Sequence, residues 1–294
     1  MPAQRPAWIA HAGLGIRQPA GAPTAQTLHD AVRLGVDRVE LDICATSDRR
    51  LLLRHDTRMP SGEPVDQLRL AELRWREPTL LTLDEGLEHL GRTPVLLDVK
   101  TASAALPLGE WLRARRDPGR FAICTELLVA LLALRDLAPR VERWRSFPDI
   151  GTRRPEHVAR VVGALLRHRS PAHVAYLARE LGGALLDMGS SPNVGRMRVG
   201  GVPWRRLLPI RLTHLAGEVD AAALSVHHWL VTPELMDVAA RLGLPVAAYT
   251  VNDAAAALRM VECGVAMVTT DDPRGMRAAV EAMPAPAAVP VEAG

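Results

Sequence analysis

The sequence predicts an α/β protein built as a (β/α)8 TIM-type barrel, and two observations lead to this fold class. Short apolar runs of strand length alternate with longer segments of helical periodicity about eight times over about 250 residues, which is the rhythm of a parallel barrel. Hydrophobic residues make up 48% of the 294 residues. A core large enough for a barrel is therefore expected, and global disorder is excluded.

The predicted strands come first in each unit. They cover residues 8–13, 38–43, 94–100, 120–124, 141–147, 222–228, 245–251 and 266–271. One more apolar run follows a polar turn after the second strand and ends at His55-Asp56. This extra run is expected to form a hairpin extension above the barrel.

The predicted helices lie between most of these strands. They cover residues 24–35, 80–91, 126–137, 233–243 and 253–264. Two of them have clear ends: Thr232-Pro233 opens one and Gly243 closes it, while Asn252 or Asp253 caps the other before Gly264. The very apolar helix 126–137 is interpreted as packed between barrel neighbours.

The domain organisation predicted is one barrel domain over residues 1–280. Within it, residues 151–220 form an enlarged connection with two more helical patterns, 155–167 and 171–182, and a stretch rich in Gly, Pro and Arg. A separate small domain at this place is the alternative. Residues 281–294 are rich in Pro and Ala and are expected to be a disordered tail.

Composition excludes several function classes. The net charge is +3 and aromatic residues make up 3% of the chain, which disfavours a nucleic-acid partner but suits an anionic small molecule. The three cysteines, Cys44, Cys124 and Cys263, have no zinc or disulfide spacing. No signal peptide or membrane-spanning run is found, so we expect a cytoplasmic protein without stable membrane insertion. The oligomeric state is left open.

Carboxylates stand at the ends of two predicted strands. Glu40 and Asp42 are two residues apart and so share a face of the strand, as do Asp98 and Lys100 on the next. Three carboxylates without cysteine form an all-oxygen site that suits Ca²⁺ or Mg²⁺. The alternative is a structural set of ion pairs with Arg38 and Lys100.

The remaining candidates are one lysine and the histidines. Lys100 is the only lysine of the chain and would offset the charge of an anionic substrate. His11 closes the first strand and His55 ends the hairpin run, so one would serve as general base and the other as general acid. Each has a structural alternative, a satisfied strand-end histidine and a surface turn. His227 and His228 end another predicted strand and would line the same pocket.

These motifs resemble the glycerophosphodiester phosphodiesterase family. The resemblance covers His11-x-Gly13, Glu40-Leu-Asp42, His55-Asp56, Asp98-Val-Lys100, Tyr249-Thr-Val-Asn252 and Thr270-Asp271-Asp272-Pro273. It implies a TIM-type barrel that hydrolyses glycerophosphodiesters to an alcohol and glycerol phosphate, as an enzyme of lipid metabolism. By motif position, Glu40, Asp42 and Asp98 would hold the metal, His11 and His55 would be the acid/base pair, and Lys100 would lie near the phosphate.

The chain also departs from the family pattern. Ala12 stands where the family has Arg, residues 21–24 replace the Pro-Glu-Asn-Thr element, and Asp98 replaces a Glu. Loss of the Arg removes a charged hydrogen bond to phosphate, worth about 1.5–3 kcal/mol, unless Arg17 or an arginine of the connection replaces it. The alternative function is therefore a catalytically weakened barrel that binds a phosphorylated ligand or a protein partner without turnover.

Overall fold

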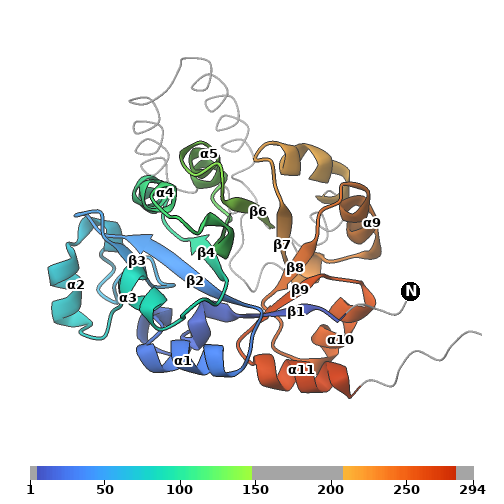
Figure 1. The fold of residues 1–294 in the computed structure, drawn as a ribbon, viewed down its shortest axis with the longest axis horizontal. Coiled ribbons are helices and arrows are strands. Elements are labelled where there is room, and N and C mark those ends of the chain that lie inside the picture. Colours follow the sequence, from blue (N-terminus) through green and yellow to red (C-terminus); the bar gives the residue numbers. More distant parts are fainter. Residues whose placement is uncertain (1–4, 148–207, 283–294) are drawn as a thin grey trace, which may run out of the picture.

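The computed structural model describes residues 5–147 and 208–282, which form a closed parallel barrel (Figure 1). One sheet has the order β1-β9-β8-β7-β6-β5-β4-β2-β3, and β1 also pairs with β2 to close it. The strands are β1 Ala7–Ala10, β2 Arg38–Ala45, β3 Leu51–Leu53, β4 Val95–Val99, β5 Phe121–Thr125, β6 Glu142–Phe147, β7 Ala223–His227, β8 Val246–Tyr249 and β9 Met267–Thr270. Every predicted barrel strand is confirmed, with ends shifted by a few residues.

The hairpin extension is confirmed as well. Strand β3 pairs antiparallel with the end of β2, from Ile43 opposite Leu53 to Ala45 opposite Leu51. Its place at the end of β2 puts the following loop above the barrel mouth. This loop carries His55.

The barrel interior is filled by one face of the strands. Its buried apolar residues are Ile9, Leu96, Ala122, Cys124, Trp144, Ala223 and Ala247. The opposite faces pack against the helices; Leu41, Leu97 and Ile123, for example, join a cluster with residues of α4 and α5. The period-2 alternation of the strands thus separates a barrel core from a sheet–helix core.

The helices surround the barrel (Figure 1). They are α1 Ala25–Arg33, α2 Leu70–Arg76, α3 Leu83–Glu88, α4 Ala105–Arg113, α5 Leu128–Leu137, α9 Pro233–Arg241, α10 Ala254–Glu262 and α11 Pro273–Glu281; residues 208–217 are also helical. All five predicted helices are present within the described residues. Thr232 caps α9 through the amide of Leu235 at 3.2 Å, and Asp253 caps α10 through that of Ala256 at 2.8 Å, as the sequence indicates.

Helices α2, α4 and α11 were not predicted. In α4 the helical pattern is interrupted by Pro107 and Gly109. Pro107 lies in the first turn, where a missing amide proton costs nothing. A Cβ on Gly109 would lie 2.6 Å from the Cβ of Leu137 in α5, so the glycine permits close packing of the two helices.

The described residues test only part of the predicted domain organisation. Residues 155–167 and 171–182, predicted to be helical, lie outside the described residues, as do 283–294. At the end of the predicted connection, Leu208 and Leu212 are buried in the same cluster as residues of β7 and β8. In the part of the chain described here, no helix combines the length and apolarity needed to cross a bilayer.

Candidate active site

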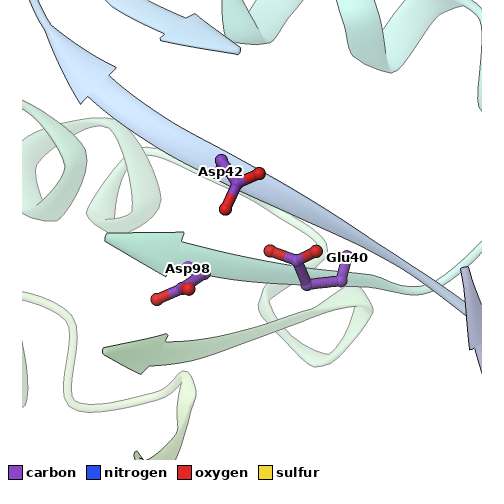
Figure 2. Close-up of side chains that lie close together, drawn as sticks. All are labelled: Glu40, Asp42 and Asp98. Atoms are coloured by element: carbon purple, nitrogen blue, oxygen red, sulfur yellow. The ribbon is translucent and has the colours of Figure 1, made fainter. Parts of the chain in front are cut away.

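The three predicted carboxylates meet at the mouth of the barrel. Strands β2 and β4 are neighbours, and their register sets Asp42 directly opposite Asp98. One oxygen from each of Glu40, Asp42 and Asp98 lies within 4.8 Å of the others, and Figure 2 shows the three side chains gathered between the two strands. Glu40 and Asp42 are only 4% and 1% exposed, so their charges are removed from water.

This cluster fits a divalent cation. Glu40 Oε1 and Asp42 Oδ2 are buried and accept no hydrogen bond from any described residue, a costly state for a carboxylate unless a cation is bound. Oxygens that share a cation with bonds of about 2.3–2.6 Å lie at most about 5 Å apart. The other Glu40 oxygen, Oε2, accepts a hydrogen bond from the backbone amide of Ala12 at 2.6 Å, which orients the carboxylate.

The pKa values of the two innermost acids diverge. Burial and the charge of Asp42 together raise the pKa of Glu40 to about 8, although the charges of His11 and Lys100 lower it. Burial would also raise the pKa of Asp42, but Lys100, His55 and His11 hold that pKa below its usual range. The surroundings of the pair thus shift the two pKa values in opposite directions, upward for Glu40 and downward for Asp42.

Lys100 lies against the carboxylates. Its Nζ is 2.9 Å from Asp42 Oδ1 and 2.5 Å from Asp98 Oδ2. Burial would lower the pKa of Lys100, but these two carboxylates and Glu40 raise it well above its usual value. The structural alternative is thus realised for Lys100, whereas Arg38 donates to the carbonyl of Val95 at 3.0 Å and takes no part in the cluster.

His11 follows β1 and faces the carboxylates. Its Nε2 is 4.0 Å from Glu40 Oε2, and its Nδ1 is 2.6 Å from Asp271 Oδ1. Burial alone would lower the pKa of His11. The hydrogen bond with Asp271 and the charges of Glu40 and Asp42 outweigh burial and raise this pKa to about 9.

His55 lies on the loop after β3 and is more exposed. Its side chain is 42% exposed, and its Nδ1 is 3.1 Å from Asp56 Oδ1. The charge of His55 lowers the pKa of Asp42, so the ring is within electrostatic range of the carboxylates. Five of the six predicted site residues thus meet at the mouth, and His55 lies on the nearby loop that follows β3.

A buried arginine holds the His55 loop in place. The Arg54 side chain is 0% exposed and forms a two-pronged ion pair with Glu77, Nε to Oε2 at 3.2 Å and Nη2 to Oε1 at 3.0 Å. Its Nη1 donates to the carbonyl of Arg58 at 3.0 Å and to that of Asp56. The segment that follows His55 is thus held by a buried side chain.

The loop after β1 contacts the other side of the His55 segment. The amide of Asp56 donates to the carbonyl of Ala20 at 3.1 Å. Gly21 has φ of +61°, and a Cβ there would lie 2.6 Å from the Cβ of His55. Residues 21–24, which replace the family's Pro-Glu-Asn-Thr element, therefore have a glycine at the position where His55 leaves no room for a Cβ.

Aromatic rings line the part of the mouth formed by the ends of β7 and β8. The Tyr249 hydroxyl donates to Glu126 Oε1 at 2.8 Å and lies 3.0 Å from the carbonyl oxygen of Phe147. His227 packs edge-on to Tyr249 with ring centroids 5.7 Å apart. Burial lowers the pKa of His227 to about 4, with His228 adding to the effect. The lowered pKa makes His227 a neutral ring at the end of β7, and among the described residues no cluster with metal-binding geometry includes it.

Asp271, whose carboxylate contacts the ring of His11, is not among the predicted site residues. Asp271 directly follows β9, the same kind of strand-end position that singled out His11 and Asp98. The signal was therefore available in the sequence. Only the closure of the barrel shows that β9 neighbours β1.

Comparisons with known proteins agree with this fold. Solved structures of glycerophosphodiester phosphodiesterases from Parabacteroides distasonis and Thermotoga maritima align with TM-scores of 0.64 and 0.60 and identities of 17% and 14%. Each alignment covers 94% of this chain, and 97% and 98% of the other. An Oleispira antarctica phosphodiesterase, solved with its product sn-glycerol-3-phosphate, aligns with a TM-score of 0.62 and 19% identity over 94% of this chain and 97% of its own.

The sequence itself matches one family model. The glycerophosphoryl diester phosphodiesterase model matches residues 198–274, from the end of the connection to the start of α11, whereas a search of curated protein sequences gives no match. The matched stretch includes Tyr249 to Asn252 and Thr270 to Pro273, two of the motifs that carry the resemblance. With the barrel observed, the match supports the predicted resemblance: over residues 198–274 the chain is similar to the glycerophosphodiester phosphodiesterases, a family of phosphoric diester hydrolases.

Proposed function

We propose that this protein hydrolyses glycerophosphodiesters to an alcohol and glycerol phosphate with the help of a divalent cation. The observation that carries the proposal is the convergence of three carboxylates, the only lysine and two histidines on one barrel mouth. A phosphodiester needs charge neutralisation, deprotonation of a nucleophile and protonation of a leaving alcohol. These six side chains offer all three.

Glu40, Asp42 and Asp98 would hold the cation, and their oxygen donors suit Ca²⁺ or Mg²⁺. When bound, such an ion neutralises charge on the phosphoryl oxygens as the transition state forms. Lys100 is bound to two of the three carboxylates, so its ammonium group would lie beside a phosphate held at the site. Its raised pKa keeps it cationic throughout the physiological range.

His11 and His55 would share the proton transfers. One would take a proton from the nucleophile, either water or the neighbouring glycerol hydroxyl, as the new P–O bond forms. With the hydroxyl as nucleophile, the first product would be a cyclic glycerol phosphate, which water would then open by breaking one ring P–O bond. The other would give a proton to the departing alkoxide as the old P–O bond breaks. The position of His11 beside Glu40 and the electrostatic effect of His55 on Asp42 support this pairing.

A small-molecule phosphodiester is the proposed substrate. The Oleispira antarctica phosphodiesterase with the same fold is described with sn-glycerol-3-phosphate as its product, which supports a glycerol phosphate product for this chain. Cytoplasmic location and a part in lipid metabolism belong to the same proposal.

Ala12 is the feature that favours the alternative of a barrel that binds without turnover. Its backbone orients Glu40, but a methyl group replaces the family's guanidinium. Arg17 lowers the pKa of Asp271 by its charge, so a positive charge from the same loop reaches this edge of the mouth. Binding without turnover is therefore the second candidate, to be separated from the first by assay.

The test is release of glycerol phosphate by metal-stripped protein given Mg²⁺, Ca²⁺ or neither, with a panel of glycerophosphodiesters. Metal-dependent release from wild type, lost in Glu40→Gln, would support the proposal. Folded protein that releases nothing with either ion would refute it. Thermal stabilisation by the metal alone, absent in Glu40→Ala, would then indicate an assembled site and favour the binding alternative.

A further inference from the structure

The closest contact of His11 comes from the far end of the chain. His11 and Asp271 are 260 residues apart in sequence, yet Nδ1 and Oδ1 are 2.6 Å apart. The cause is barrel closure, because β1 and β9 are parallel neighbours with Ala10 opposite Thr270. The next residue on each strand is therefore His11 on one side and Asp271 on the other.

Asp271 is held in turn by Asn252, which follows β8. Asp271 Oδ2 accepts from Asn252 Nδ2 at 2.6 Å, while Asn252 Oδ1 accepts from the Asp271 amide at 2.9 Å and from Thr270 Oγ1 at 3.1 Å. Both carboxylate oxygens and the backbone of Asp271 are thus engaged. These hydrogen bonds fix the orientation in which the Asp271 carboxylate meets the imidazole of His11.

We infer that Asp271 is the positioning residue of His11: it holds the proton on Nδ1 and leaves Nε2, which faces Glu40, as the nitrogen that exchanges protons with the substrate. A carboxylate bonded to one ring nitrogen sets the tautomer and the ring orientation of a histidine. The inference builds on the proposed function and assigns Asp271 no contact with substrate.

The other histidine has no equivalent support. Asp56, which contacts His55, is its sequence neighbour, its side chain is 58% exposed, and no described residue holds its carboxylate. The Asp271 arrangement is therefore specific to His11. It joins the ends of β1, β8 and β9 in one chain of hydrogen bonds.

The experiment is Asp271→Asn, which keeps the size of the side chain but removes the charge that fixes the proton on Nδ1. Asp272→Asn is the matched control, because the neighbouring Asp272 only caps α11 through the amide of Gly275 at 2.9 Å. We expect kcat of Asp271→Asn to fall by about 10²–10³-fold with KM changed less than about threefold. The control should keep the wild-type kcat.

A readout independent of activity is the tautomer of His11. Long-range ¹H–¹⁵N spectra of the full chain, recorded as the pH is raised until the His11 ring is neutral and assigned with His11→Ala, distinguish a proton on Nδ1 from one on Nε2 in that neutral ring. Wild type and Asp272→Asn should show the Nδ1–H form, and Asp271→Asn should lose it. An unchanged His11 spectrum in Asp271→Asn would overturn the inference, even if turnover fell.

A double-mutant cycle completes the test. In a His11→Ala background, Asp271→Asn should lower kcat no further, because Asp271 acts through the ring. Additive losses would overturn the inference. If wild type hydrolyses none of the diesters, the proposed function fails, but the tautomer spectra still decide the role of Asp271. Should Asp271→Asn not fold, Asn252→Ala, which frees one carboxylate oxygen, replaces it and should shift the tautomer in part.

Discussion

His11 and His55 reach the same mouth by different physical means. His11 extends a barrel strand, is 16% exposed and is bound at Nδ1 by a carboxylate from the neighbouring strand. His55 sits on a loop beyond a hairpin, is 42% exposed and has its backbone, not its ring, fixed by Arg54 and by the loop after β1. The loop that carries His55 is held by a buried side chain, whereas the end of β1 places His11 directly beside its partner on β9.

The largest expected effect comes from removing either ring. His11→Ala and His55→Ala should each lower turnover by about 10²–10⁴-fold, because each removes one of two proton transfers. His29→Ala, an exposed histidine on α1 whose ring contacts His89, is the matched control. Wild-type turnover in either site variant would show that the corresponding histidine has no acid/base role.

Breaking the anchor of His55 should come next. Glu77→Gln leaves the guanidinium of Arg54, with 0% of its side chain exposed, without its anion, and should lower the free energy of unfolding by about 3–5 kcal/mol. Glu110→Gln breaks an exposed pair with Arg49 and should cost less than about 1 kcal/mol. Urea denaturation measures both. Equal losses in the two variants would mean that burial of Arg54 does not matter.

The environment of His11 predicts a pH effect in the metal-free protein. Its pKa is raised from 6.5 to about 9, so the stabilisation is complete below pH 6.5 and is lost as the pH rises through 9. From pH 7 to 9 this amounts to about 2 kcal/mol. The pKa of Glu40 is raised from 4.5 to about 8. Glu40 therefore also lowers the stability of the folded state as the pH rises between these two values.

A bound cation should oppose this loss, because it favours the deprotonated form of Glu40. We therefore expect Ca²⁺ or Mg²⁺ to raise Tm more at pH 9 than at pH 7, measured by thermal unfolding with and without chelator. A metal-free Tm that stays level or rises over this range would contradict the assigned environment of His11.

The smallest effect tests the contact between the β1 loop and His55. Gly21→Ala and Gly35→Ala both place a Cβ at φ of +61°, but only the Cβ at position 21 would have neighbours within 4 Å, the Cβ of His55 at 2.6 Å and the Cδ1 of Ile16 at 3.4 Å. Each should cost about 1–2 kcal/mol of stability from backbone strain. Only Gly21→Ala should also lower kcat, by about tenfold. Equal kcat in the two variants would show that His55 does not depend on this contact.

The fold and the first set of site residues could be predicted because their signals are local. Strands alternate with period 2, so Glu40 with Asp42, and Asp98 with Lys100, had to share a face wherever the strands lay. Helices α2, α4 and α11 escaped prediction because their patterns are short or interrupted. In α4, Pro107 fits because it falls in the first turn, and Gly109 is explained by its packing against Leu137.

What the sequence determined by itself is the barrel and the chemistry at its strand ends, since apolar period and residue type are carried by neighbouring positions. The tertiary structure alone decided which strand ends meet. Closure of β1 against β9 joins His11 to Asp271 across 260 residues, and the fold of the hairpin loop buries Arg54 against Glu77. Such partners are set by strand order and packing, because contacts between distant segments leave no periodic trace in the chain.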